Sequence, residues 1–249
     1  ERLYNDILID NGKRIRVGKF LAPVGQWNLI HAAPLVWSIE RPYSSTYSYS
    51  NYITGIEYGQ SMDILSGSRF DIYYQGTNDF DPKPKTSHPR EYTEVLGASW
   101  TIIDDLDSRS SIDIQYAKVR ENNANRSTVS WQKVWYLSQW DLDTHLVYTR
   151  VEADDAISQL AAPMLSNTSW DGGGYIQARY HMSSHWNFYG RAEYFHFAEN
   201  AAAGKIYILG ARYIINNIGN INIEYRNGTG AEQIYGDSIS FSYNTLFRW

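Results

Sequence analysis

Apolar and polar residues alternate along the last segment of the chain, 237–249. On an extended strand one face would carry Ile239, Phe241, Tyr243, Thr245, Phe247 and Trp249, and the other would carry Ser238, Ser240, Ser242, Asn244 and Arg248. A two-residue period over about ten residues, with aromatic side chains at the ends, is typical of a strand that has lipid on one face and water on the other. The pattern therefore predicts a two-faced strand.

The same alternation recurs along the whole chain and predicts about thirteen strands. In chain order they cover residues 2–9, 13–20, 52–60, 68–76, 91–103, 110–120, 128–139, 144–153, 173–183, 186–199, 205–215, 220–227 and 237–249.

Short and long connections alternate between these strands. The short ones are 10–12, 61–67, 104–107, 140–143, 183–185 and 216–219, and the long ones are 21–51, 77–90, 121–127, 154–172, 200–204 and 227–236. Such alternation is typical of an up-and-down antiparallel β-barrel with tight turns at one end and loops at the other. We therefore expect one all-β domain over residues 1–249. Because single-chain bacterial barrels have an even strand number, we also expect at least fourteen strands in the complete protein, with the N-terminal strand or strands missing here.

The width of the barrel decides which face of each strand is in contact with water. Side chains fill a barrel of about eight strands, whereas a wider barrel encloses a hydrated lumen. Rows such as Ile112, Ile114 and Tyr116 should then face lipid, where an arginine at mid-bilayer would cost about 2–4 kcal/mol. The basic side chains expected to line the lumen are Arg14, Arg16, Arg69, Arg150, Arg179, Arg191, Arg212 and Arg226, with Asp71 among the acidic ones.

Arginine outnumbers acid at these wall positions, although the formal net charge of the chain is -5. A narrow aqueous bore with low-dielectric walls concentrates the field of such charges, which predicts a weak preference for anions. The alternative is that these arginines pair with neighbouring carboxylates such as Asp71, Glu152, Glu193 and Glu224 and only brace the wall.

Composition narrows the possibilities further. Aromatic residues make up 15% of the chain while the mean hydropathy is only -0.47, so apolar residues are dispersed and no run approaches the length of a membrane helix. The chain has no cysteine, which excludes disulfides and thiolate sites. The net negative charge and the lack of a basic run argue against a nucleic-acid partner. We expect no cofactor and no metal site.

Residues 16–42 read RVGKFLAPVGQWNLIHAAPLVWSIERP and differ from the other connections. Pro23 and Pro34 interrupt any strand ladder, and large apolar residues occupy what should be a solvated loop. The GKF-x-A-P-x-G-x-W-N-x-x-H stretch, together with the meander and the aromatic last strand, resembles the Gram-negative outer-membrane porin superfamily, which includes phosphate-selective and general diffusion channels. That resemblance implies a barrel in the bacterial outer membrane, in contact with lipid and lipopolysaccharide, often trimeric, that passes small hydrophilic solutes or anions.

In such proteins a loop folded into the lumen narrows the pore, and residues 21–51 are the segment that corresponds to it by resemblance. Its polar groups that could reach a constriction are His31, Glu40 and Arg41. The segment could equally cover a contact between subunits.

Two other functional classes stay open at this stage. The barrel could be a structural sheath or anchor for a partner protein. It could also be an outer-membrane hydrolase, because His181 and Ser183 have the i, i+2 spacing of a base and a nucleophile on one strand face. We expect the channel rather than an enzyme, because in the predicted register both residues share the lumen face with Arg179 and Ser183 lies at a turn.

Overall fold

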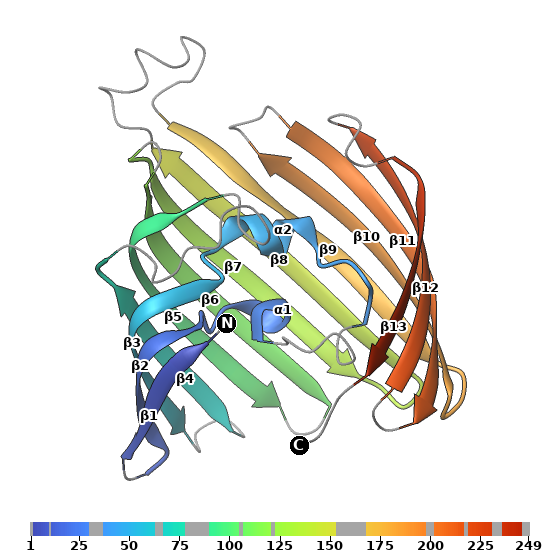
Figure 1. The fold of residues 1–249 in the computed structure, drawn as a ribbon, viewed down its shortest axis with the longest axis horizontal. Coiled ribbons are helices and arrows are strands. Elements are labelled where there is room, and N and C mark those ends of the chain that lie inside the picture. Colours follow the sequence, from blue (N-terminus) through green and yellow to red (C-terminus); the bar gives the residue numbers. More distant parts are fainter. Residues whose placement is uncertain are drawn as a thin grey trace.

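The computed structural model describes residues 2–9, 11–29, 37–62, 67–77, 90–104, 107–120, 123–152, 168–197, 202–216, 219–230 and 236–245. Thirteen strands follow one another along this part of the chain, with two short helices between the second and third (Figure 1). They are β1 (Leu3–Ile9), β2 (Lys13–Leu21), α1 (Gly25–Leu29), α2 (Tyr43–Ser48), β3 (Tyr52–Met62), β4 (Ser68–Gln75), β5 (Tyr92–Asp104), β6 (Ser108–Val119), β7 (Asn125–Tyr136), β8 (Trp140–Glu152), β9 (Thr168–His181), β10 (Trp186–Phe197), β11 (Ala202–Asn216), β12 (Gly219–Gly230) and β13 (Ser238–Thr245).

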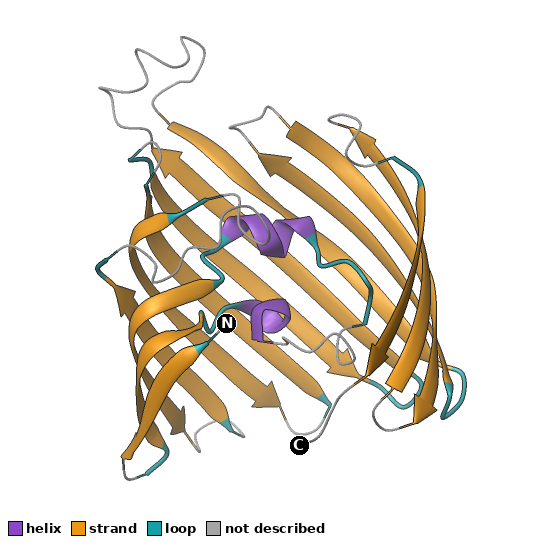
Figure 2. Cartoon of the chain, viewed as in Figure 1, coloured by secondary structure: helices purple, strands orange, loops and turns teal. Residues whose placement is uncertain are grey.

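All thirteen strands form one antiparallel sheet in which each strand pairs with its neighbours in sequence. The prediction of an all-β, up-and-down antiparallel sheet is confirmed. The sheet curves into a barrel-like wall around α1 and α2 (Figure 2). Among the described strands, β1 and β13 each pair on one side only, so no ladder closes the wall between them.

The turn between β1 and β2 shows how local sequence sets the register. Asn11 and Gly12 both have positive φ, 60° and 73°, a left-handed conformation that Asn and Gly adopt more readily than other residues. The pairs that follow run from Ile9 with Lys13 to Leu3 with Lys19. This turn and the other short connections lie at one end of the strands, which we call the short-turn end; the opposite end is the loop end.

The two faces of the sheet have opposite character, and β6 illustrates the contrast. Ile112 and Ile114 point outward and are about half exposed, whereas Asp113 and Gln115 point inward and are buried. A water-soluble sheet would bury its apolar row, because apolar surface in water is unfavourable. An apolar exterior around a polar interior is stable when the exterior meets lipid.

The start of β8 corrects a strand boundary. Residues 140–143 were expected to form a turn, but β8 begins at Trp140 and the turn occupies 137–139. Asp141 and Asp143 resemble turn residues in composition, yet both face inward and are buried against polar partners. Asp143 accepts hydrogen bonds from Gln132 and Tyr175, which offset part of the penalty for burying it.

An apolar core lies inside the wall, on the loop-end side. It joins residues next to β2, β3 and β7 to the inner faces of β2 to β6 and β8, and its members are Phe20, Ala22, Val24, Tyr49, Ile53, Tyr73, Tyr92, Val95, Ala117, Val119, Ala124, Val147 and Val151. Neither described helix is long and apolar enough to cross a membrane.

The orientation of the faces generates a stability prediction. Ile114→Lys, near the middle of β6 on the outward face, should lower the free energy of unfolding from lipid vesicles by about 2–4 kcal/mol. The control Ser127→Lys, on the same face but near the loop end of β7, should cost about 0–1 kcal/mol. Equal effects at the two depths, measured by urea titration, would show that this face does not meet a hydrocarbon layer.

Candidate functional site

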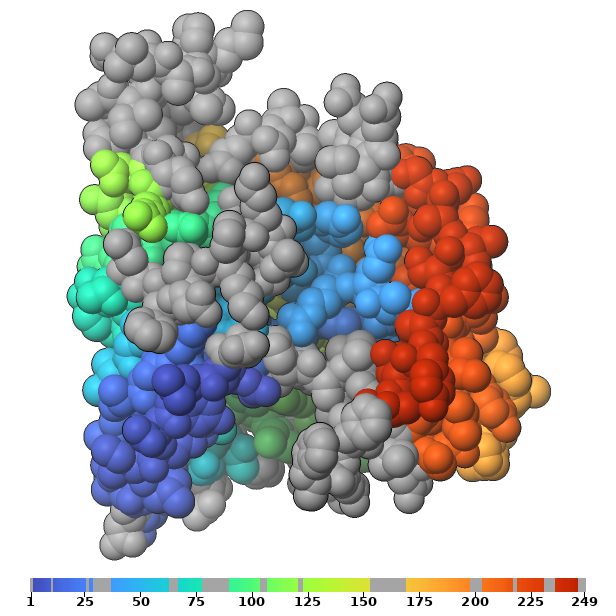
Figure 3. All heavy atoms as spheres, viewed as in Figure 1, coloured from blue at the N-terminus to red at the C-terminus, as the bar shows by residue number. Residues whose placement is uncertain are grey.

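The candidate site is the interior of the barrel, where residues 21–29 and 37–51 lie against the inner wall. In Figure 3 light-blue atoms of this region are visible in the interior, next to the red C-terminal strands. Helix α2 contacts β8, β9 and β10, and α1 contacts β7. The described part of the segment therefore contacts the wall of its own chain.

Hydrogen bonds from the main chain hold the segment in place. Four of its N–H groups donate to side-chain oxygens of the wall: Gly25 to Asp113 (3.2 Å), Ile39 to Glu224 (2.8 Å), Ser44 to Glu193 (2.8 Å) and Ser50 to Gln115 (2.9 Å). Three of the acceptors are carboxylates, which form stronger hydrogen bonds than neutral acceptors. They stand on β6, β10 and β12, so the segment is attached at widely spaced points around the wall.

Arginines from the wall reach the same segment. Arg191 Nη1 donates to Ser38 Oγ (2.9 Å) and to the carbonyl oxygen of Glu40 (2.8 Å). Arg226 Nη1 forms an ion pair with Glu40 Oε2 at 2.6 Å. These contacts fix residues 38–40 beside β10 and β12, where Glu40 is a partner of the wall arginines.

A charged cluster covers the inner face of β1 to β4. Arg14 is paired with Glu57, Arg16 is paired with Asp6 at 2.7 Å, and Arg69 is paired with Asp71 at 2.8 Å. All six side chains come from adjacent strands, because the inward positions of an antiparallel sheet are aligned by its register.

A second cluster lies near the short-turn end of β8 and β9. Arg179 Nε donates to Asp141 Oδ2 (2.8 Å), and His181 Nε2 lies 2.8 Å from the same oxygen. The guanidinium of Arg179 also lies 4.4 Å from the centre of the Trp37 ring, a cation–π contact between the wall and the in-folded segment.

Within both clusters the bases are more exposed than the wall acids. The side chain of Arg69 is 42% exposed and that of Arg14 is 19% exposed, whereas Glu57 and Asp71 are 1% and 5% exposed. Arg179 is likewise 19% exposed above Asp141 at 5%. The short carboxylates lie against the wall and the longer guanidinium groups extend over them. Asp6 and Glu40, about 30% exposed, are the acids in these ion pairs that stay accessible.

Two further residues of the predicted site belong to neither charged cluster. Arg212 faces inward on β11 and is nearly buried. Arg41 lines a small cavity beneath the segment with Asn28, Thr46, Tyr49 and His145, and burial lowers its pKa. His31 lies outside the described residues.

Arg150 is a correction to the predicted site. It was expected in the lumen, but it shares the outward face of β8 with Leu146 and Tyr148, is 57% exposed and pairs with Glu152 at 2.7 Å. The inward positions of β8 are Asp141, Asp143, His145, Val147, Thr149 and Val151. Both charges lie within three residues of the loop end, beyond the zone where lipid exposure is most costly.

Sequence reasoning missed several partners. Asp141 and Asp6 were not selected, and Glu193 and Glu224 were placed on the wall without a role as acceptors for the segment. Counting alternate residues along β8 could have identified Asp141, because it lies two and four positions from Asp143 and His145 and therefore shares their face. No sequence signal pairs residue 44 with residue 193.

The proposed base and nucleophile are engaged with different partners. Ser183 Oγ accepts hydrogen bonds from the N–H groups of His185 (3.3 Å) and Trp186 (3.1 Å) within its turn. The other ring nitrogen of His181 lies 2.9 Å from Asn187 Oδ1. In this geometry the serine shapes a turn and the histidine belongs to the charged cluster.

Comparison with solved structures defines the class of fold. An anion-selective porin from Comamonas acidovorans matches with a TM-score of 0.71 at 10% identity, over 98% of this chain and 73% of that one. Salmonella typhi OmpF, in complex with daunomycin, matches with a TM-score of 0.70 at 15% identity, over 97% and 76%. A trimer form of OmpT, an outer membrane protein of Vibrio cholerae, matches with a TM-score of 0.62 at 10% identity, over 95% and 73%.

The chain therefore has the porin-type β-barrel fold. No family model matches the sequence, and no curated protein matches it either.

The attachment of the segment generates a prediction. Glu193→Ala removes the acceptor for both the N–H and the hydroxyl of Ser44. Losing a buried charged acceptor costs about 1.5–3 kcal/mol, so amide hydrogen exchange across residues 43–51 should accelerate roughly 10- to 100-fold. The control Glu152→Ala, on the outer face, should leave these amides unchanged. Unaltered exchange in Glu193→Ala would mean that this carboxylate does not hold the segment.

Proposed function

We propose that the protein is an outer-membrane porin, a passive channel for small hydrophilic solutes that catalyses no reaction. The apolar exterior and polar interior of the wall support this proposal, as does the porin-type fold. The solute path runs through the barrel, past the in-folded segment.

The observation that carries the proposal is the unequal exposure of paired charges inside the barrel. A solute in the lumen approaches Arg14, Arg69 and Arg179 more closely than the acids buried beneath them. Around these three pairs the positive groups therefore contribute most to the potential, whereas Asp6 and Glu40 are the accessible acids elsewhere, and low-dielectric walls concentrate the field. A weak anion preference follows.

The segment 21–51 supplies size exclusion in this proposal. The hydrogen bonds of its described residues to β6, β10 and β12 support this role, because α1, α2 and residues 37–40 would then occupy part of the cross-section of the lumen. The remaining path passes between the segment and the exposed arginines of the wall.

A homotrimer is part of the proposal, because the solved structures with this fold include the trimer form of OmpT. The alternative is a barrel that sheathes or anchors a partner protein. The in-folded segment argues against it, since the segment occupies space that such a partner would need. A hydrolase lacks support because His181 and Ser183 have other partners.

Selectivity is testable by reversal potentials in planar bilayers. The purified protein should conduct without a partner and favour chloride over potassium. Arg69→Gln and Arg179→Gln together should lower the anion-to-cation permeability ratio by about twofold or more, because each removes an exposed charge above a buried acid. Arg150→Gln is the matched control and should leave the ratio unchanged. Cation preference in the wild type would contradict the assignment, and a protein that stays closed would favour the sheath.

Size exclusion has a separate test. Replacing residues 37–50 with a short glycine-serine linker should raise single-channel conductance several-fold, because it removes α2 and residues 37–40 from the lumen. Ser45→Ala, within the same segment, should conduct like the wild type. Barrel integrity is checked by heat-dependent mobility on gels. Unchanged conductance in a folded linker variant would show that the segment does not narrow the path.

A further inference from the structure

Arg126 is a buried base that the proposed channel does not use. It lies near the loop end of β7 and faces inward, and its side chain is 1% exposed. Its register partners are Ala117 on β6 and Val151 on β8, which both belong to the apolar core. A guanidinium group keeps its charge and its five N–H donors in such surroundings, so burying it is costly unless those donors find acceptors.

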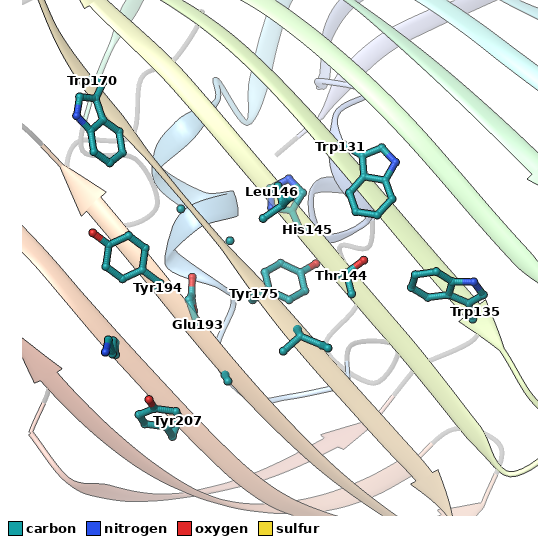
Figure 4. Close-up of a pocket in the computed structure, with 15 residues that line it drawn as sticks. Trp131, Trp135, Thr144, His145, Leu146, Trp170, Tyr175, Glu193, Tyr194 and Tyr207 are labelled. Atoms are coloured by element: carbon teal, nitrogen blue, oxygen red, sulfur yellow. The ribbon is translucent and has the colours of Figure 1, made fainter.

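One carboxylate lies beside Arg126, and Arg126 shares it with a second base. Asp171 Oδ2 is 2.7 Å from Arg126 Nη2 and 3.5 Å from Arg90 Nη2, so two guanidinium groups converge on one oxygen. Asp171 is fully buried on β9, next to Trp170, whose ring is on the outward face (Figure 4). Of the acids in the described ranges, only Asp171 forms an ion pair with Arg126.

The donors of Arg126 are not satisfied by these neighbours. Its Nε, Nη1 and Nη2 atoms are all buried, and none of them has an acceptor in hydrogen-bond geometry among the residues that the structure describes. Arg191, another buried base, differs, because its Nη1 donates to Ser38 Oγ and to the carbonyl oxygen of Glu40. Since nearly all buried polar groups in folded proteins are hydrogen-bonded, Arg126 needs an acceptor that its neighbours do not supply.

The end of α2 brings a second donor to the same region. Ser48 Oγ is buried, and it too has no hydrogen-bond partner in the described part of the chain. Thr128, the next inward residue after Arg126 on β7, donates to the carbonyl oxygen of Ser48 (3.3 Å) and so holds Ser48 against this strand. The serine hydroxyl can donate to the same acceptor as the guanidinium group.

An anion fits these donors better than a water molecule does. Both can accept hydrogen bonds, but an anion also lowers the cost of burying a cation that shares its carboxylate with Arg90, and charge-assisted hydrogen bonds are about twice as strong as neutral ones. The burial of Arg126, Asp171 and Ser48 leaves room only for a small ion. We propose that the guanidinium group of Arg126 and the hydroxyl of Ser48 bind one small monovalent inorganic anion of the chloride type.

This ion has a different role from the anions that the proposed channel passes. It is enclosed between the wall and α2, and it links β7 to the end of α2, so it adds to the attachment of the in-folded segment. The proposal therefore goes beyond the proposed function, because it concerns an ion that stays in the structure and not one that crosses it.

The direct test is a crystal structure of the whole protein with sodium bromide in place of sodium chloride. Bromide replaces chloride in such a site and is identified by its anomalous scattering, so we expect an anomalous peak beside the guanidinium group of Arg126. A water molecule without anomalous signal at that position would overturn the proposal.

Thermal stability gives a second readout. A ligand that binds only the folded state raises the melting temperature, so the wild type should melt about 5 °C higher in saturating sodium chloride than in sodium gluconate of equal ionic strength. Gluconate is the reference because it is too large for an enclosed site. Arg126→Gln should lose this difference. Arg69→Gln, which removes an exposed arginine of the lumen, is the matched control and should keep it.

Ser48→Ala tests the site if Arg126→Gln does not fold. It deletes one neutral donor, so the chloride concentration that gives half of the stabilisation should rise about fivefold. Equal melting temperatures of the wild type in the two salts, or a full chloride effect in Arg126→Gln, would contradict the assignment. Neither measurement depends on conduction. A protein that never conducts but shows the bromide peak and the chloride effect would remove the channel and support the site.

Discussion

The hydrogen-bond ladder between neighbouring strands is the constraint on which the other features depend. In hydrocarbon every main-chain N–H and C=O group needs a partner within the protein, and an antiparallel sheet supplies one across each strand pair. Because the ladder fixes register, it also fixes which residues share a face. Asp113 faces the lumen and Ile114 the lipid only because the pairs along β5, β6 and β7 stay in step. A slip of one residue would exchange the two rows.

The interior has to satisfy its polar groups without a large apolar core. The in-folded segment contributes to this, because its main-chain N–H groups donate to Asp113, Glu193 and Glu224, and its carbonyl at Glu40 accepts from Arg191. A buried carboxylate without such donors would be strongly destabilising. Wall and segment therefore stabilise each other. The apolar core that includes Phe20, Ile53 and Tyr73 also stabilises the interior, on the loop-end side.

Most of the fold could be predicted from the alternation of residues, because a strand between lipid and water leaves a two-residue period that is hard to mistake. The same logic gave the inward direction of Arg14, Arg69, Arg179 and Arg191. It failed at the loop end of β8, where the period is preserved but Arg150 belongs to the outer row; near the membrane boundary a charge can face outward at low cost. It also could not pair Ser44 with Glu193, since contacts between a loop and a distant strand depend on the path of the whole chain.

The stacking of guanidinium groups over carboxylates has an evolutionary consequence. Where an arginine such as Arg69 covers Asp71, replacing the base with a neutral residue both deletes a positive charge and uncovers a negative one. One codon change thus reverses the local sign of the passage instead of merely weakening it. Closely related channels could in this way diverge in the ions they admit while keeping the same scaffold. In such a relative, the carboxylates that are now buried would favour cations.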